Sequence, residues 1–480
     1  MGAAWCVRGR GTELMREPTM SAHVSDTPTI AQAPAGPAEW PNPVHAWYAV
    51  GVFAIALLFN FLDRQILQLL VTPIKNDLQI SDTEMSLLIG FAFVSFYVLA
   101  GIPISRLVDT YSRRLIIGCG IASWSAMTAL CGMAQNYWQL FAARVGVGIG
   151  ESCNGPATYS MLSDMFPREK LPRAIAVLNF GFMFGSGLAL IVGGAVVEWV
   201  SSRPELVLPL VGTVRPWQQT FFIVGLPGLL VAILIATVRE PVRRGFPASM
   251  VAAGAAKRGA LSVSEIVHYL RDEQRAYAPM FVGTGLKALI AFGTSIWTPT
   301  FLHRQFGWSL GEAGLTIGAI LLTFAPLGLV CGGLLAERLA KRGYADANWR
   351  VVLLATIGVL PFSVLFPLMP TAELAVAMIA LNTFVGSFGP GPQNAALQTI
   401  TPNPMRGQVT ALYLAVFNLI GFGLGPLFVA LLTDYVFGSE SLLPYSMALT
   451  SAIIGPIAVW VVWRGLKPYG ESIVRARSWT

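Results

Sequence analysis

Four charged residues stand inside long apolar segments of the N-terminal half: Asp63 and Arg64 in one segment, Arg144 and Glu151 in another. A charge at the centre of a membrane-spanning helix costs about 2.5–3.5 kcal/mol, so all four together would cost on the order of 10 kcal/mol if they faced lipid. We therefore expect them to face a polar interior. A carboxyl group there can exchange protons, and a guanidinium group can bind a carboxylate or phosphate. Proton transfer and anion binding are the chemistry indicated.

The depth of these residues in their segments predicts a short ladder of charges. At a rise of about 1.5 Å per residue, Asp63 and Arg144 lie at similar height in antiparallel helices, and Glu151 lies about 10 Å nearer the cytoplasm on the same face as Arg144. We expect Arg144 to pair with Asp63 in one access state and with Glu151 in another, which would switch their proton affinity. Two alternatives stay open. Arg64 or Arg144 holds a substrate phosphate, or the charges only lock the two helices together.

The composition places these helices in a membrane. Of 480 residues, 54% are apolar and 12% are charged, and the mean hydropathy is +0.62, whereas soluble domains carry roughly 25% charged residues. Twelve apolar segments have about the 20 residues that span a bilayer. They are residues 46–71, 86–108, 114–134, 137–163, 172–198 and 217–238, then 277–303, 312–336, 350–369, 374–399, 405–432 and 443–465.

Basic residues gather in alternate loops, which is the pattern of cytoplasmic loops. They are Arg113, Arg114, Arg168, Lys170, Arg173, Arg338, Lys341, Arg342 and Arg406. We expect a multi-pass inner-membrane protein with both termini in the cytoplasm. Its predicted parts are a disordered N-terminal tail (1–44), a six-helix bundle (45–238), a linker with an amphipathic helix (239–276), a second six-helix bundle (277–466) and a C-terminal tail (467–480). Met1 and Met20 are both possible starts.

The two halves repeat each other. Residues 81–90 match residues 309–318, and residues 105–114 match residues 333–342, both at an offset of 228. Such duplication is common in transporters.

The same alignment shows where the halves differ. At the offset of 228, Ala291 and Phe292 stand opposite Asp63 and Arg64. Aligning Val147-Gly148 with Val385-Gly386 places Asn382 opposite Arg144 and Gly389 opposite Glu151. The second half lacks the ladder, so we expect the first bundle to carry coupling and the second mainly to shape the cavity.

The repeated loop sequences, SRLVDTYSRR at 105–114 and GLLAERLAKR at 333–342, resemble the motif between the second and third helices of the major facilitator superfamily. The resemblance implies an all-α membrane protein with the major facilitator fold, 12 transmembrane helices in two pseudo-symmetric six-helix bundles. It also implies a cytoplasmic gate formed by Asp109, Arg113, Arg114, Glu337, Arg338, Lys341 and Arg342. The first copy departs from the family pattern at Ser105 and Thr110, so we expect its contacts in the cytoplasmic gate to be weaker.

Two shorter motifs, Asn60–Gln65 (NFLDRQ) and Arg144–Ser152 (RVGVGIGES), resemble the Spinster family, whose animal members are associated with export of sphingosine phosphate and lysolipids. The resemblance implies an amphiphilic, lipid-like substrate.

Further polar residues inside the spans are candidates for the cavity lining, although hydrogen bonding between helices explains most such residues. The predicted substrate-binding set is Arg64, Arg144, Asn60, Asn382, Gln393 and Thr298, and the predicted proton-coupling set is Asp63, Glu151 and Arg144. Lys287 stands apart, because it is too deep in its span to reach the interface.

These patterns predict a proton-coupled secondary active transporter that moves a lipid-like (sphingoid phosphate or lysolipid-type) or other organic solute by alternating access. The alternatives are a proton-independent facilitator, a lipid scramblase, or a multidrug or organic-anion exporter. An enzyme is not expected, because only Asp63 and Glu151 resemble a catalytic pair, and ATP drive is unsupported, because the chain has no GxxxxGK[ST] phosphate loop.

The expected partners are the small amphiphilic substrate, protons and membrane lipids. The net charge of +7 reflects the basic loops, so no nucleic acid is expected, and neither cysteines nor histidines have the spacing of a metal site. We expect no cofactor and a monomer.

Overall fold

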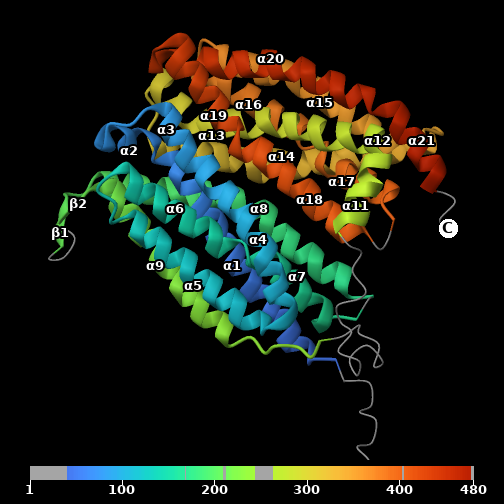
Figure 1. The fold of residues 1–480 in the computed structure, drawn as a ribbon. Coiled ribbons are helices and arrows are strands. Elements are labelled where there is room, and N and C mark those ends of the chain that lie inside the picture. The colour runs from blue at the N-terminus through green and yellow to red at the C-terminus, as the bar shows by residue number, and fades with distance from the viewer. Residues whose placement is uncertain (1–39, 168, 209–211, 244–262, 403–404, 477–480) are drawn as a thin grey trace, which may run out of the picture. The chain divides into compact units, whose positions relative to one another are not determined.

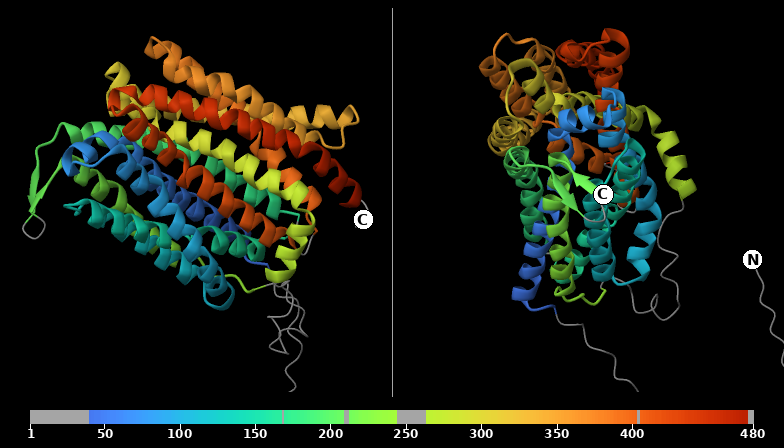
Figure 2. Two further views of the ribbon diagram at one scale, coloured as in Figure 1. Left: turned by 45° about the horizontal axis from the view of Figure 1, so that its top comes forward. Right: turned by 90° about the vertical axis from the view of Figure 1, so that its left-hand side faces the viewer.

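The protein is described here by a computed structural model that covers residues 40–167, 169–208, 212–243, 263–402 and 405–476 (Figure 1). Helices dominate it, and eleven of them are long and apolar enough to cross a membrane. The first half contains α1 (Pro43–Leu69), α2 (Val71–Leu78), α3 (Asp82–Ser86), the π-helical turn η1 (Leu87–Phe91), α4 (Ala92–Thr110), α5 (Arg113–Cys131), α6 (Tyr137–Glu151), α7 (Asn154–Met165), α8 (Leu171–Ser201) and α9 (Pro216–Ala236). Strands β1 (Leu206–Leu208) and β2 (Gly212–Val214) pair antiparallel between α8 and α9 and project from the helices (Figure 2).

The second half follows the same plan. It contains α11 (Val263–Asp272), α12 (Gln274–Ala278), η2 (Pro279–Gly283), α13 (Thr284–Phe306), α14 (Leu310–Lys341), α15 (Ala347–Leu365), η3 (Phe366–Leu368), α16 (Ala372–Gly386), α17 (Pro390–Ile400), α18 (Arg406–Asn418), η5 (Leu419–Gly423), α19 (Gly425–Leu431), η6 (Leu432–Phe437), η7 (Glu440–Leu442), α20 (Leu443–Arg464) and α21 (Leu466–Ala476). Helix α21 lies where the sequence predicts a tail from residue 467. It buries Tyr469 and Ile473 against the bundle, which explains why it is ordered.

The span predicted at 137–163 is not among these eleven helices. The segment predicted at 137–163 folds as α6 and α7, which are separated at Ser152 and Cys153. Pro156 lacks the N–H that would bond to the carbonyl of Ser152, so it favours an end to the regular helix there. The equivalent span of the second half is also divided, between Gly386 and Pro390. The twelve-helix arrangement thus agrees with the sequence-based prediction.

Helix boundaries repeat at the offset found in the sequence. Gln79 and Gly307, 228 positions apart, both end a helix in the left-handed conformation, with φ of 53° and 71°. Ser81 and Ser309 then both cap the next helix through their side chains.

The broken spans give a different register from the sequence alignment. Their caps, Asn136 and Thr371, are 235 positions apart, three fewer than the Val-Gly match implied. Glu151 therefore stands opposite Gly386 instead of Gly389, and Arg144 stands opposite Ile379 instead of Asn382. A short apolar dipeptide recurs too often in such spans to fix a register. The conclusion that the second half lacks these charges is unchanged.

Three clusters of buried apolar side chains hold the helices together. One cluster draws on both halves and includes Ile74 and Ile80 from the first with Leu302 and Leu443 from the second. Two further clusters contain buried residues of one half each. The first-half cluster includes Val108, Ile117 and Val238; the second-half cluster includes Tyr277, Trp349 and Ile400. The halves therefore share a core at one end of the spans and have separate cores at the other.

Candidate functional site

The charged cluster, defined as Asp63, Arg64, Arg144 and Glu151, lies where α1 meets α6. Asp63, Arg144 and Glu151 are each no more than 2% exposed. Both Nε and Nη2 of Arg64 lie 2.7 Å from Oε2 of Glu151. The partner of Glu151 in this structure is thus Arg64, whereas the sequence predicted Arg144. Counting helix turns relates residues on one helix, but it does not show which side chains of a neighbouring helix reach them.

Arg144 is the unusual member of the cluster. It forms no ion pair with a described residue, and its Nε and Nη1 are buried without a hydrogen-bond partner. The predicted pair with Asp63 is therefore not formed in this state. Asp63 instead accepts a hydrogen bond at Oδ2 from the Thr128 hydroxyl, and its Oδ1 is buried without a partner, as is Oε1 of Glu151. Buried polar atoms normally have hydrogen-bond partners. These unpaired atoms therefore indicate a site that rearranges or that binds a ligand.

An aromatic ring lies beneath both arginines of the cluster. The guanidinium carbon of Arg64 is 4.6 Å from the centre of the Phe93 ring and 5.3 Å from that of Tyr97, and the guanidinium carbon of Arg144 is 5.6 Å from Phe93. Such distances allow cation–π attraction. Gly148 permits this approach of α6 to α4, because a Cβ there would lie 2.5 Å from the Phe93 carbonyl oxygen. Asn60 is also buried, one turn before Arg64 on α1.

The predicted binding residues of the second half lie in two different places. Asn382 lines a cavity of about 260 Å³ together with Lys287, and its Oδ1 is buried without a partner. Gln393 donates instead to the Tyr413 hydroxyl, within the second-half cluster. Thr298 donates to the carbonyl of Thr294 on its own helix, at 2.8 Å. Of the three residues, only Asn382 has a free polar atom at a cavity.

The first copy of the repeated loop motif forms contacts within its own half. Arg113 is 1% exposed; it donates to the Ser160 carbonyl at 3.0 Å and forms an ion pair with Asp164. Its backbone N–H donates to Glu240 Oε1 at 2.8 Å. Arg114 donates to a carbonyl of α9, at 3.4 Å. The side chain of Asp109 lies outside the described residues.

The second copy is exposed. Glu337 and Lys341 pair along their own helix at 2.6 Å, and Arg338 and Arg342 are exposed. Neither copy forms an ion pair between the halves in the part of the chain that the structure describes.

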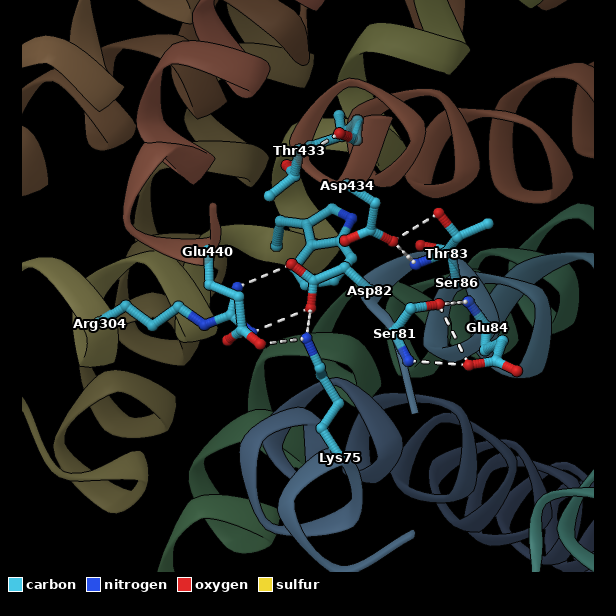
Figure 3. A network of polar contacts seen from close by, with 12 residues as sticks. Lys75, Ser81, Asp82, Thr83, Glu84, Ser86, Arg304, Thr433, Asp434 and Glu440 are labelled. Atoms are coloured by element: carbon cyan, nitrogen blue, oxygen red, sulfur yellow. Dashed lines mark hydrogen bonds and ion pairs between the residues drawn. The ribbon is translucent and has the colours of Figure 1, made fainter. Parts of the chain in front are cut away.

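A network that the sequence analysis missed joins the halves at the end where they share a core (Figure 3). We define this inter-half network as Lys75, Asp82, Thr83, Arg304, Asp434 and Glu440. Asp82 is fully buried and accepts two hydrogen bonds from Arg304, at 2.8 and 2.9 Å, and one from Lys75. Glu440 pairs with Lys75 at 2.8 Å and with Arg304 at 2.7 Å.

A second contact extends the network. The Thr83 amide and hydroxyl both donate to Oδ2 of Asp434, at 2.7 and 2.6 Å. In sequence the charged members look like ordinary loop charges, because the contacts that join the halves link residues far apart in the chain, such as Asp82 and Arg304. One feature of the sequence could have indicated this network. Asp82 follows Ser81, which caps a helix, and Arg304 lies at the end of the helix that precedes the equivalent cap, Ser309, in the second half.

Residues 53–426 match the model of the Major Facilitator Superfamily. The chain belongs to this superfamily. It is therefore a membrane transporter and not an enzyme, and the facilitator fold accounts for its two related halves.

Among curated relatives, the facilitator is 29% identical over 425 residues to an MFS-type efflux pump of Mycolicibacterium smegmatis, covering 88% of this chain and 93% of the pump. It is 24% identical to the sphingosine-1-phosphate transporter SPNS2 of Danio rerio, covering 70% of this chain and 65% of that protein. Among solved structures, a bacterial homolog of the human lysosomal transporter Spinster, in an inward-facing and unoccupied conformation, superposes with a TM-score of 0.74 at 23% identity, over 91% of this chain and 99% of that one. The chain is thus similar to Spinster proteins in sequence and in fold.

Proposed function

We propose that this facilitator is a proton-coupled secondary transporter of an amphiphilic or other organic solute, working by alternating access in the inner membrane with both termini in the cytoplasm. The charged cluster carries the proposal. It places two carboxyl groups and two guanidinium groups together among apolar side chains and leaves an atom of Asp63, Arg144 and Glu151 without a partner. A purely architectural ion pair would have its polar atoms satisfied.

Exchange of partners within the cluster would couple protons to movement. Arg64 compensates Glu151 in this structure, while Arg144 is available to either carboxylate. A change of access that separates Arg64 from Glu151 would leave a buried carboxylate without a cation, which favours its protonation. Movement of Arg144 toward Asp63 would favour loss of a proton there. Uptake of a proton by Glu151 and release of a proton by Asp63 would then both depend on the access state.

The inter-half network supports an assignment of the access state. Ion pairs and a shared core join the halves at the network end, whereas the end with the repeated motif has a separate core in each half. With cytoplasmic termini, the network end is periplasmic, so the structure corresponds to a state open to the cytoplasm. The repeated motif would form its inter-half contacts in the opposite state.

Proton coupling can be tested in proteoliposomes that contain a trapped pH-sensitive dye. A lysolipid or sphingoid phosphate added outside should drive proton movement in the wild type. We expect Glu151→Gln and Asp63→Asn each to lower that movement about 100-fold. Glu373→Gln, which removes an exposed carboxylate at the start of α16, is the control and should leave it unchanged. Transport by the two variants at the wild-type rate, or lipid exchange that ignores the pH gradient, would contradict the proposal.

Export of drug-like organic solutes is a second candidate, favoured by the similarity to an efflux pump over 88% of the chain. A thermal-shift screen separates the two. Stabilisation of purified protein by lysolipids or sphingoid phosphates supports the lipid-like substrate, and stabilisation by drug-like cations alone supports the exporter.

A further inference from the structure

Lys287 is the only Lys, Arg, Asp or Glu within the interior of a described span in the second half; the others stand at span ends. It is on α13, about 20 Å along the span that begins at Gln274, so its ammonium group cannot reach the interface. It forms no ion pair with a described residue. Its Nζ has one weak hydrogen bond, to the Gly386 carbonyl at 3.4 Å. Holding a charge in such a place is costly unless an anion compensates it.

The repeat explains why this lysine has no acid. In the first half, Arg64 on α1 reaches Glu151 at the end of α6. In the second half, Lys287 on α13 reaches the same end of α16, where Gly386 occupies the position of Glu151. Gly389 is close as well, because a Cβ there would lie 2.2 Å from Nζ. The second half therefore has a cation at a different position of its first span, since Lys287 stands opposite Phe59 at the offset of 228, while the position of Glu151 has no side chain.

The space beside Lys287 is lined by polar groups. The cavity of about 260 Å³ is bordered by Lys287, Asn382, Ser295 and Thr383. Drug-sized ligands occupy roughly 300–1,000 Å³, so this cavity suits a headgroup and not a whole amphiphile. The hydroxyl groups can donate to an anion, as can the amide nitrogen of Asn382.

Packed aromatic side chains connect the wall of this cavity to the charged cluster. Phe292 lines the cavity and packs against Phe422 with ring centres 5.3 Å apart. Phe422 packs against Phe93 at 6.1 Å, and Phe93 lies under Arg64. The cavity wall is therefore in packing contact with the charged cluster through three aromatic rings.

We infer that the cavity around Lys287 is an anion subsite, which binds the phosphate or carboxylate group of the transported solute. Arg64 is compensated by Glu151, and Arg144 lies near the carboxyl groups of Asp63 and Glu151, so Lys287 is the cation that has no acid partner among the described residues. This inference rests on the proposed transport of an organic solute and makes it more specific, because it requires that the solute be an anion.

Equilibrium binding to purified protein in detergent tests the subsite without any proton gradient, so it is independent of coupling. The probes are a lysophosphatidic acid and the monoacylglycerol with the same acyl chain, which differ by the phosphate. We expect Lys287→Met to weaken binding of the lysophosphatidic acid at least tenfold and to leave the monoacylglycerol unchanged. Lys287→Arg should retain most of the affinity. The control is Lys467→Met, which removes an exposed lysine outside the membrane interior.

A second variant leaves the lysine in place. Gly389→Ala adds a methyl group that meets the end of the Lys287 side chain and otherwise only Ala355 at 4.0 Å, so the ammonium group must move. We expect a smaller loss that is again specific to the phosphate-bearing probe. Gly391→Ala, whose methyl group would meet only Leu329 at 3.6 Å, is its control.

Competition identifies the source of the anion. Displacement of lysophosphatidic acid by millimolar inorganic phosphate would show that the anion alone fills the subsite, and displacement only by acylated phosphates would show that the chain contributes. Equal weakening of both probes by Lys287→Met, or no weakening of either, would overturn the inference. Proton-coupled transport by Lys287→Met that keeps the wild-type preference for the phosphate-bearing probe would overturn the subsite and leave the proposed function standing.

Discussion

The two halves of this transporter share a fold and differ in how they treat buried charge. The first half encloses two carboxyl and two guanidinium groups, of which Arg64 and Glu151 are paired. The second half encloses one ammonium group, Lys287, opposite a glycine. The halves align at their helix ends, so the difference lies in side chains placed on equivalent backbones. A duplicated scaffold thus encloses a cluster of carboxyl and guanidinium groups in one copy and, among the described residues, a lysine without an acid partner in the other.

The largest expected effect concerns stability. Arg64→Gln leaves Glu151 buried without its cation, and breaking a buried pair in this way costs about 3–5 kcal/mol. The double variant Arg64→Gln/Glu151→Gln should recover most of that loss. Lys287→Met should not destabilise the protein, since it removes a charge that has no acid partner among the described residues. Unfolding free energies in detergent, measured against denaturant, provide the check.

If Arg64→Gln and Lys287→Met destabilise the protein equally, the contrast between the halves fails. If the double variant is no more stable than Arg64→Gln alone, Arg64 contributes by packing against Phe93 and Tyr97 and not by compensating Glu151.

The next effect concerns the missing carboxylate of the second half. Gly386→Glu supplies an acid at the position of Glu151, and a Cβ there meets only Val359 at an ordinary 3.6 Å. The new carboxylate should pair with Lys287 and compete with the substrate anion. Hydrogen bonds to charged groups contribute about 1.5–3 kcal/mol, so we expect affinity for lysophosphatidic acid to fall by about 10- to 100-fold in the binding assay. Gly386→Gln has nearly the same shape without the charge and should retain most of the affinity.

The sequence was sufficient for features that repeat or that depend on apolar length. The twelve spans, the duplication and the isolation of Lys287 follow from hydropathy and an offset of 228. Features that depend on two distant segments could not be obtained in that way. The pairing of Glu151 with Arg64 requires the rotation of α1 against α6, and the inter-half network requires Asp82 and Arg304 to meet across 222 positions. Side-chain partners across helices are decided by packing, which one sequence does not reveal.

A smaller effect concerns the two ends of the molecule. Asp82→Asn should weaken the inter-half network and shift the population toward the opposite access state. The contact between Thr83 and Asp434 remains. We therefore expect the free-energy difference between the two access states to change by about 1–2 kcal/mol, within the usual range of coupling energies. Spin labels at exposed Gln79 and Ser439, one in each half, should report a longer label-to-label distance in Asp82→Asn than in the wild type.

Glu84→Gln is the matched control for that experiment, because Glu84 bonds to Ser81 within its own half. Equal distance distributions for Asp82→Asn and the wild type would show that apolar packing alone closes this end.

The smallest effect separates the two copies of the repeated loop motif. Glu240 is partly buried, which by itself raises its pKa, but hydrogen bonds from the Ser112 hydroxyl and the Arg113 backbone N–H outweigh burial and bring the pKa below its ordinary value of 4.5. A carboxylate with a lowered pKa stabilises the folded state above pH 4.5, and this contribution disappears as the pH falls through the lower, folded-state value.

Glu240→Gln should therefore lower the free energy of unfolding by about 0.2–1 kcal/mol near neutral pH. Its stability should also fall less steeply than that of the wild type below pH 4.5. Thermal unfolding in detergent at a series of pH values measures both effects. Glu337→Gln alters the exposed copy, where solvent screens the ion pair with Lys341, and should change the acid profile less than Glu240→Gln does. Parallel profiles for the wild type and Glu240→Gln would mean that Arg113 holds this loop through Ser160 and Asp164 alone, and the two copies of the motif would then differ in burial but not in their dependence on pH.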